Sequence, residues 1–301
     1  MSAASWKISA FAPKRIVQAA LLQHDELDEW DYDLVIAGRE VSEDRPQDWV
    51  LEAWYPSKPG AQQKKALAGL FADKAPNLEI EKLPDEDWLA LSQQGVEPIS
   101  AGEFYVHTPE FAPQDGAINF TIPAAQAFGT GQHRTTAGCL EMLSAMKRQG
   151  VVARNVADIG TGTGLLGFAA LSLWPGAKTT ASDIDPVCAQ VVEDNAALNA
   201  IPLGAGPGEM TMVIADGMDD PLLQMRGPYD LLIANILAGP LVELAPHFAA
   251  SVSPKGSLVL AGLLTGEQER AVNRAYRRAK FTPVARLERG DWAILWFRRR
   301  P

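Results

Sequence analysis

The chain has 301 residues, 47% of them hydrophobic, and a formal net charge of −10. This length exceeds one average domain, and the apolar fraction is enough for a sizeable core, so we expect one large or two unequal domains. No apolar run approaches the roughly 18 residues that cross a bilayer, and the first residues lack the apolar stretch of a secretory signal. We therefore expect a cytoplasmic protein without a membrane partner.

The chain holds only two cysteines, Cys139 and Cys188, and four histidines. Two cysteines within predicted helices do not make a disulfide framework, and they are typical of small buried thiols in a reducing compartment. The sequence has no Cys-x-x-Cys or His-x-x-x-His pattern. We therefore expect no metal site.

The negative charge is distributed unevenly. Residues 1–100 carry 10 basic and 18 acidic side chains, residues 101–269 carry 7 and 17, and the last 32 residues carry 10 and 2. An acidic body favours a basic partner such as a ribosomal protein, although plain solubility accounts for it equally well. The basic end, with Arg298, Arg299 and Arg300, could contact RNA, but solvated surface charge is the simpler interpretation, and we expect no nucleic-acid requirement.

Residues 1–83 alternate strand and helix patterns at short intervals. We expect strands at 6–11, 32–37, 49–54 and 78–83, with helices from Pro13 through Leu21 and over 61–72. This order, β-α-β-β-α-β, predicts a ferredoxin-like α+β domain. It contains no phosphate loop and no cluster of nucleophile and base, which is typical of a binding module.

Residues 84–126 are expected to be a linker with a short helix near 88–91 and short strands at 103–107 and 117–122. The loop Ala127–Thr136 follows, with Gly129 and Gly131 as hinges, and we expect Thr135 or Thr136 to cap the next helix. Hydroxyls and free amides at a helix start can hold a ligand carboxylate, although an ordinary capped loop explains the same residues.

Residues 127–301 are expected to be an α/β domain. Five predicted strands alternate with four predicted helices, at 155–159, 164–174, 178–183, 186–199, 210–215, 229–235, 239–252, 256–262 and 267–280. Helices of this length between strands predict a parallel sheet covered on both faces. Segments 284–288 and 292–297 flank Arg289-Gly290-Asp291 and predict a hairpin that adds an antiparallel strand.

Polar side chains follow four successive strands of this predicted sheet: Asp158, Asp183, Asp216 and Asn235. The first strand also runs into a turn with glycines at every second position, Gly160, Gly162 and Gly164. Ligands of open parallel sheets bind beyond the carboxyl ends of the strands. Four polar strand ends in register therefore predict a ligand site.

Two cofactors compete for that site. Residues 162–167 match the dinucleotide pattern G-x-G-x-x-G, and Asp183 lies about 20 residues further on, where an acid binds ribose. Asp158, however, would place a carboxylate beside the pyrophosphate. A cationic ligand, S-adenosylmethionine, removes that objection. The turn would then approach its methionine part, Asp158 would orient the turn or accept from the amino group, Asp183 would bind the ribose, Asp216 would lie near the adenine and Asn235 would face the reacting centre.

Four segments carry a family resemblance: 127–136, 158–164, Asp183-Ile184-Asp185-Pro186, and 234–241, which reads Ala-Asn-Ile-Leu-Ala-Gly-Pro-Leu. Together they resemble the bacterial ribosomal protein L11 methyltransferase (PrmA) family. The resemblance covers residues 127–297 and implies a Rossmann-like, seven-stranded class I methyltransferase domain. It also implies cofactor contacts by Thr136, Gly160, Asp183 and Asn235, and a substrate-recognition role for residues 1–83. Gln132, Arg134 and Thr161 depart from the family's usual residues.

The resemblance implies methyl transfer to lysine side-chain or N-terminal amines of ribosomal protein L11. We expect a monomer. We expect Asn235 to orient the amine, because no general base is evident and His133 is better explained as a loop-ordering residue. We also expect the acidic N-terminal module to recruit the basic substrate. The alternatives are another protein-lysine or small-molecule methyltransferase, a nicotinamide-dependent dehydrogenase and a non-enzymatic binding module.

Overall fold

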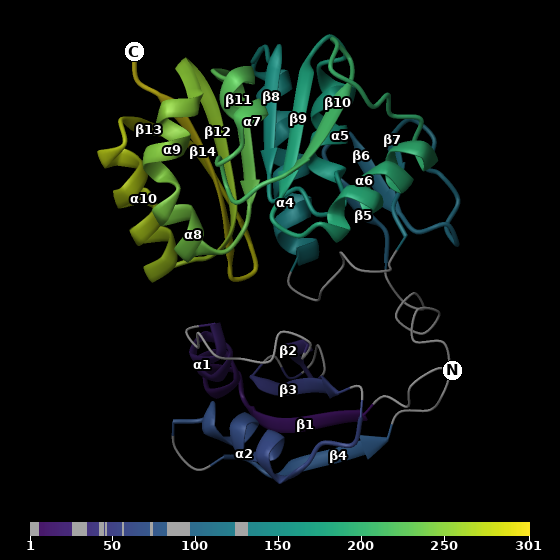
Figure 1. Cartoon of the computed structure of the whole chain (residues 1–301), viewed down its shortest axis with the longest axis vertical. Coiled ribbons are helices and arrows are strands. Elements are labelled where there is room, and N and C mark those ends of the chain that lie inside the picture. The colour runs from purple at the N-terminus through teal and green to yellow at the C-terminus, as the bar shows by residue number, and fades with distance from the viewer. Residues whose placement is uncertain are drawn as a thin grey trace. The chain divides into compact units, whose positions relative to one another are not determined.

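A computed structural model describes residues 6–25, 35–41, 45, 47–55, 57–72, 75–82, 97–123 and 132–301. Contacts between Cα atoms divide the chain into two compact units, Met1–Leu91 and Ser92–Pro301. Each unit has its own sheet and its own buried core (Figure 1).

In the part of the first unit that the structure describes, four strands form an antiparallel sheet and two helices accompany it. Its elements are β1 (Trp6–Pro13), α1 (Lys14–Asp25), β2 (Val35–Glu40), β3 (Asp48–Tyr55), α2 (Ala61–Gly69) and β4 (Leu78–Lys82). The strands lie in the order β2-β3-β1-β4, and every neighbouring pair is antiparallel. The predicted ferredoxin-like order is thus confirmed. The predicted helix at 88–91 lies outside the described residues.

The two faces of this sheet differ in chemistry. Ile8, Leu51 and Ala53 are buried with Val17 of α1 and Leu67 of α2 in the helix-covered core. Since side chains alternate along a strand, Glu52 between Leu51 and Ala53 points to the other face.

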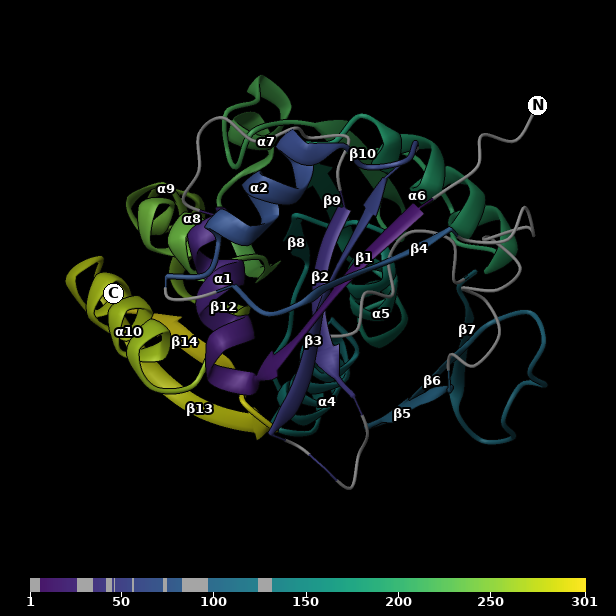
Figure 2. The ribbon, with the colours of Figure 1, turned by 90° about the horizontal axis from the view of Figure 1, so that it is seen from below.

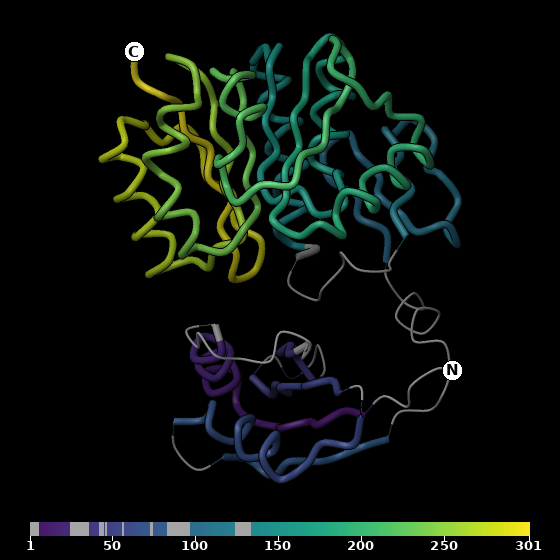
Figure 3. Tube along the Cα trace, viewed as in Figure 1, coloured from purple at the N-terminus to yellow at the C-terminus, as the bar shows by residue number. Residues whose placement is uncertain are grey.

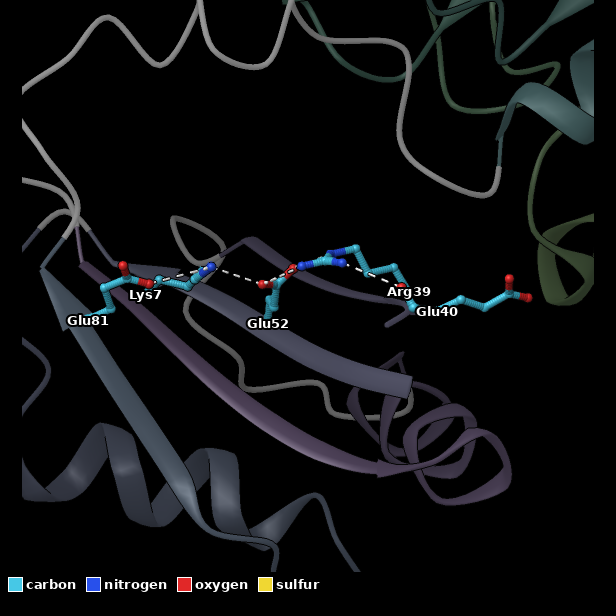
Figure 4. A network of polar contacts seen from close by, with 5 residues as sticks. All are labelled: Lys7, Arg39, Glu40, Glu52 and Glu81. Carbon is cyan, nitrogen blue, oxygen red and sulfur yellow. Dashed lines mark hydrogen bonds and ion pairs between the residues drawn. The ribbon is translucent and has the colours of Figure 1, made fainter. Parts of the chain in front are cut away.

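On that other face, Glu52 is the centre of a polar network (Figure 4). Its side chain is 6% exposed and accepts hydrogen bonds from Lys7 Nζ at 3.0 Å and from Arg39 Nε at 2.8 Å. Burial alone would raise the pKa of Glu52, but the hydrogen bonds from Arg39 and Lys7 outweigh it and lower the pKa. Glu52 therefore stabilises the unit as a carboxylate, because it is deprotonated more readily in the folded chain than in the unfolded one.

We predict that Glu52→Gln lowers the free energy of unfolding at pH 7 by about 2 kcal/mol. This is less than the 3–5 kcal/mol of a fully buried pair, because the Arg39 side chain is 46% exposed. The difference in free energy of unfolding between wild type and variant should decrease as the pH falls through the lowered pKa of Glu52, because the wild-type carboxyl is then protonated and also uncharged. Urea unfolding at several pH values measures both effects.

The matched control is Glu81→Gln. Glu81 also faces Lys7, with Oε2 3.8 Å from Nζ, but its side chain is 65% exposed. Its replacement should change the free energy of unfolding by less than about 0.5 kcal/mol. Equal losses in the two variants would contradict the assigned role of Glu52.

A small sheet precedes the large one in the second unit. It consists of β5 (Ile99–Ala101), β6 (Phe104–His107) and β7 (Ile118–Thr121), in the order β5-β6-β7. Phe104 and Phe120 stack with ring centroids 6.0 Å apart, and both belong to the core that the large sheet also uses. The described part of the predicted linker 84–126 thus packs with the second unit. The division into 1–83, 84–126 and 127–301 with separate roles stays a prediction.

The second unit is built on a seven-stranded sheet in the order β10-β9-β8-β11-β12-β14-β13, which can be traced in Figure 3. Its elements are α4 (Gln132–Arg148), β8 (Asn155–Ile159), α5 (Leu165–Leu173), β9 (Lys178–Asp183), α6 (Val187–Leu198), β10 (Met210–Ile214), α7 (Pro221–Arg226), β11 (Tyr229–Asn235), α8 (Ala238–Glu243), α9 (Ala245–Ser251), β12 (Val252–Leu264), α10 (Glu267–Arg278), β13 (Phe281–Arg289) and β14 (Trp292–Arg299). All neighbours are parallel except β14, which runs antiparallel to both β12 and β13. The predicted seven-stranded α/β domain is confirmed.

Helices cover both faces of this sheet. Leu231 and Ile233 of β11 are buried in one core with residues of α4, α5 and α6, whereas Leu232 and Ala234 are buried in another with residues of α7, α8, α9 and α10. Figures 1 and 2 both show α8, α9 and α10 together beside β12, β13 and β14. Both cores are apolar, and this explains why the strands read as continuous hydrophobic runs.

The structure differs from the sequence prediction at three helices. The predicted helix 239–252 is two short helices, α8 and α9, and Pro246, which lacks a backbone N–H, stands in the first turn of α9. Helix α7 was not predicted; its N-cap is Asp220, whose carboxylate accepts from the amides of Leu222 and Leu223. Helix α4 begins at Gln132, so Thr135 and Thr136 lie within its first turns and the prediction that either caps it is wrong.

Candidate active site

A cavity of about 640 Å³ opens at the carboxyl ends of β8, β9, β10 and β11. It lies at the point where the strand order reverses, since the chain proceeds from β8 through β9 to β10 on one side and from β11 to β12 on the other. Its size is in the range of small-molecule sites, and its position is where open α/β sheets bind ligands.

Six of the eight predicted site residues line this cavity. They are Thr136, Gly160, Gly162, Asp183, Asp216 and Asn235. The other two, Asp158 and Gly164, are not part of its wall. The loop 127–131 lies outside the described residues, and the side chain of His133 is not described.

The glycines of the turn between β8 and α5 serve two purposes. All three have positive φ angles, 69° at Gly160, 55° at Gly162 and 84° at Gly164. A Cβ atom would lie 2.2 Å from Ile236 Cγ2 at Gly160 and 2.7 Å from Phe168 Cζ at Gly164, but at Gly162 it would meet nothing within 4 Å. Gly160 and Gly164 thus allow close packing, whereas Gly162 keeps the turn's backbone open to a ligand.

Asp158 supports this turn from behind. It is 1% exposed, and Oδ2 accepts hydrogen bonds from Thr161 Oγ1 at 2.6 Å and from the Gly167 amide at 2.9 Å. Because Gly167 is the third residue of α5, Asp158 satisfies an amide that the helix itself leaves without a partner. Burial raises the pKa of Asp158 to about 6, although both hydrogen bonds oppose this rise. Of the two roles predicted for Asp158, this geometry favours orienting the turn.

Asp183 joins the turn to the end of β9. Its Oδ2 accepts from the Gly162 amide at 2.8 Å and its Oδ1 from the Asp185 amide at 3.1 Å. A carboxylate has about four lone-pair sites, so acceptor capacity remains for hydroxyl groups of a ligand in the cavity. Asp216 and Asn235 line the cavity as well, and neither side chain forms a hydrogen bond with another residue of the described chain.

The charge of the cavity wall decides between the two candidate cofactors. Two carboxylates, Asp183 and Asp216, line the cavity, and the described wall contains no lysine, arginine or histidine. A pyrophosphate would meet carboxylates with no opposing cation, whereas a sulfonium and an ammonium group meet the charge they need. The residues present fit S-adenosylmethionine and do not fit a dinucleotide.

Known proteins agree with this assignment. The family model described as Ribosomal protein L11 methyltransferase (PrmA) matches residues 18–300. The ribosomal protein L11 methyltransferase of Agrobacterium fabrum is 38% identical over 273 residues, covering 89% of this chain and 90% of the relative. That of Rhizobium meliloti is 37% identical over 283 residues, with 93% and 92% covered.

The chain belongs to the ribosomal protein L11 methyltransferase family. Its fold agrees: a crystal structure of ribosomal protein L11 methylase from Lactobacillus delbrueckii subsp. bulgaricus aligns with a TM-score of 0.57 and 24% identity, covering 68% of this chain and 99% of that one. The predicted family, methyltransferase activity and cofactor, S-adenosylmethionine, are confirmed. The dehydrogenase and binding-module alternatives are set aside.

The apolar residues of this methyltransferase cavity were not predicted as site residues, and Ile184, Leu237 and Trp292 are the most informative of them. Ile184 is 65% and Leu237 59% exposed, which is unusual for large apolar side chains beside strands. Each lies within two residues of a predicted polar strand end, so that position was the available signal. Trp292 begins β14 and reaches the cavity only because the hairpin returns to the carboxyl end of the sheet. No pattern in the neighbouring residues predicts this position.

We predict that Asp183→Asn weakens S-adenosylmethionine binding about 10- to 100-fold. The amide keeps one acceptor oxygen but loses the charge, and a hydrogen bond to a charged group contributes about 1.5–3 kcal/mol. Calorimetric titration with S-adenosylmethionine measures the dissociation constant. The control is Asp185→Asn, an exposed carboxylate two residues on that is not part of the wall. Equal dissociation constants for wild type and Asp183→Asn would refute the assignment.

A second prediction concerns Asp158. Because its folded pKa of about 6 is above the unfolded value, its contribution to stability is greatest at low pH and is lost as the pH rises through about 6. Asp158→Asn cannot ionise. The variant's free energy of unfolding minus that of wild type should therefore increase by about 2 kcal/mol between pH 4 and pH 7. Urea unfolding of both proteins across this range tests the prediction, and a constant difference would contradict it.

Proposed function

We propose that this chain transfers methyl groups from S-adenosylmethionine to lysine side-chain or N-terminal amines of ribosomal protein L11. The observation that carries the proposal is the cavity at the strand ends, whose described wall holds two carboxylates and no cation. The family membership supports the same substrate, because the relatives are named for it.

The cofactor would be held by residues from four strand ends. Asp183 would accept from the ribose hydroxyls, and the open backbone around Gly162 would approach the methionine part. Asp216 would lie near the adenine, and Ile184 and Leu237 would supply apolar contact to a flat ring. Thr136, from the first turns of α4, would complete the wall. When bound, the cofactor supplies an electrophilic methyl group on a sulfonium.

Asn235 is the residue that we assign to the acceptor amine. It stands at the carboxyl end of β11 beside the switch point, and its carboxamide Oδ1 can accept an N–H from a neutral amine. Accepting that hydrogen orients the nitrogen lone pair, and such positioning is the main contribution a protein can make to an in-line displacement. No histidine or lysine occurs among the described wall residues to act as a base, so the amine proton passes to water.

Recruitment of the substrate is assigned to the first unit. Residues 1–91 carry 17 acidic and 10 basic side chains, which suits a basic ribosomal protein as the partner. We further propose that the enzyme is a cytoplasmic monomer. No helix among the described residues is long and apolar enough to span a membrane.

The decisive experiment incubates the full chain with methyl-tritiated S-adenosylmethionine and purified ribosomal protein L11, followed by mass spectrometry of the product. We expect label on amines of L11. Label on another protein of a cell lysate, with none on L11, would favour the alternative of a different substrate. Residues 84–301 alone should label L11 with a KM at least 10-fold higher, and equal efficiency would refute the recruitment role.

We predict that Asn235→Ala lowers kcat about 10- to 100-fold, the scale of one lost orienting hydrogen bond with imperfect positioning. Steady-state kinetics with L11 gives kcat, and titration gives the affinity for S-adenosylmethionine, which should change much less. The control is Asn273→Ala on α10, where the side chain donates to the Glu269 carbonyl and is not part of the wall. A loss of cofactor affinity equal to the loss in kcat would contradict an orienting role.

A further inference from the structure

The edge of the seven-stranded sheet opposite the cavity is rich in cations. Each parallel strand begins at this edge and ends at the cavity, and each preceding helix ends here. Six cationic side chains lie at helix ends and strand starts in the middle of the sheet: Lys147, Arg148, Arg154, Lys178, Arg226 and Lys255.

Six more cationic side chains extend this edge at its C-terminal side. Figure 1 shows the hairpin between β13 and β14 at one end of the sheet and the C-terminus at the other. The end of α10, the start of β13 and the end of β14 meet at that second end, where the Arg300 amide donates to the Lys280 carbonyl. The cations there are Arg277, Arg278, Lys280, Arg298, Arg299 and Arg300.

These twelve side chains, here called the basic edge, form no ion pair with a carboxylate of the described residues. Residues 101–301 contain 17 lysines and arginines, and the basic edge holds twelve of them. Of the other five, Arg270, Arg286 and Arg289 pair with carboxylates of the described chain, and Arg134 and Arg274 do not. The basic edge therefore keeps its positive charge unneutralised.

The carboxylates at the strand starts do not offset this charge. Asp230 accepts from the backbone amides of Arg154 and Asn155 at 3.0 and 3.2 Å. Glu209 accepts from the Gly206 amide at 2.7 Å. Both are occupied by neutral backbone donors, so no arginine or lysine of the basic edge is held by them.

Helix dipoles explain only part of the pattern. Cations at helix C-termini are favourable, and this accounts for Lys147, Arg148, Arg226, Arg277 and Arg278. Lys280 directly follows the C-cap of α10 and shares this favourable position. The other six lie on strand ends or turns away from helix C-termini, and their charge is open to a partner of opposite charge.

We propose that the basic edge binds the phosphate backbone of RNA. Its cations span six neighbouring strands, from β9 to β13, which is about 24 Å at a spacing of about 4.8 Å between strands. The tryptophans nearest to it, Trp174 and Trp296, are 5% and 1% exposed. Because both of these rings are buried and cannot stack on bases, the contact is to phosphates, and binding depends on salt rather than on sequence.

The surface suits RNA better than a membrane. Peripheral membrane binding commonly uses an amphipathic helix with a continuous apolar face. At the basic edge, exposed apolar side chains such as Val152 and Met225 belong to different elements and are scattered among the cations. At physiological salt, charges more than about 8 Å away are largely screened, so the acidic remainder of the chain does not cancel the local charge.

The test uses the full chain and a fluorescein-labelled, single-stranded 20-nucleotide RNA of mixed sequence, with anisotropy recorded from 50 to 200 mM KCl. Lys178→Gln combined with Lys280→Gln removes two exposed cations at opposite ends of the basic edge. We expect about 10-fold weaker binding and a decrease of about 1.4 in the slope of log K against log salt, since each single-strand phosphate contact contributes about 0.7.

The matched control is Arg270→Gln combined with Arg274→Gln, two exposed cations of α10 outside the basic edge. This control should bind RNA like wild type. No RNA binding by wild type at 50 mM KCl, or equal losses in both double variants, would overturn the proposal. Binding to phosphatidylserine vesicles without RNA binding would overturn it in favour of a membrane. Both double variants should methylate L11 at the wild-type rate, so this result is independent of the proposed function.

Discussion

The site depends on two carboxylates that hold one glycine turn from opposite sides. Asp158 binds the Thr161 hydroxyl and the Gly167 amide from within the core, and Asp183 binds the Gly162 amide from the end of the next strand. Part of the turn's backbone is paired with backbone oxygens, since the Gly160 and Thr161 amides donate to the Ser182 carbonyl and the Gly164 amide donates to the Thr161 carbonyl. The Gly162 amide is paired instead with the Asp183 side chain. Through the bonds to Gly167 and Gly162, the two carboxylates connect the turn to α5 and β9. The ligand-facing backbone is thereby positioned by the sheet rather than by a free loop.

The two carboxylates differ in their surroundings. Asp158 is enclosed, and desolvation raises its pKa to about 6. Asp183 lines the cavity and has a second backbone donor, the Asp185 amide. A cation bound in the cavity would favour the ionised form of Asp158, because an opposite charge lowers a carboxyl pKa. The free-energy cost of ionising the buried Asp158 is therefore offset by a cationic ligand such as S-adenosylmethionine, the cofactor of this family. A pyrophosphate would increase that cost, which is why a glycine pattern of the dinucleotide type serves a different cofactor here.

The sequence was sufficient to predict the features that depend on residues close together in the chain. Helices expected between the strands predicted a parallel sheet covered on both faces, in agreement with the burial of Leu231–Ala234, and the polar residues after four strands predicted the cavity wall. Two features depended on distant parts of the chain. Asp158 is buried only when the whole sheet is assembled. Trp292 reaches the cavity through the hairpin's return. The break between α8 and α9 was locally visible as Pro246, but an apolar periodicity over 239–252 masked it. Helix α4 began before its predicted cap because Gln132, His133 and Arg134 carry no strong start signal.

Acidic and basic side chains of the second unit lie at opposite ends of its parallel strands. Turns at their carboxyl ends carry Asp183 and Asp216, and turns at their amino ends carry Arg154 and Lys178. A cationic cofactor and a basic protein substrate are both attracted to the first edge and repelled by the second. Ion pairs between the two edges are impossible across strands of five to seven residues, which at about 3.3 Å per residue separate them by roughly 16–23 Å. The unneutralised cations therefore remain available to a polyanion at the far edge while methyl transfer proceeds at the cavity. One sheet can thus present two surfaces of opposite charge without either weakening the other.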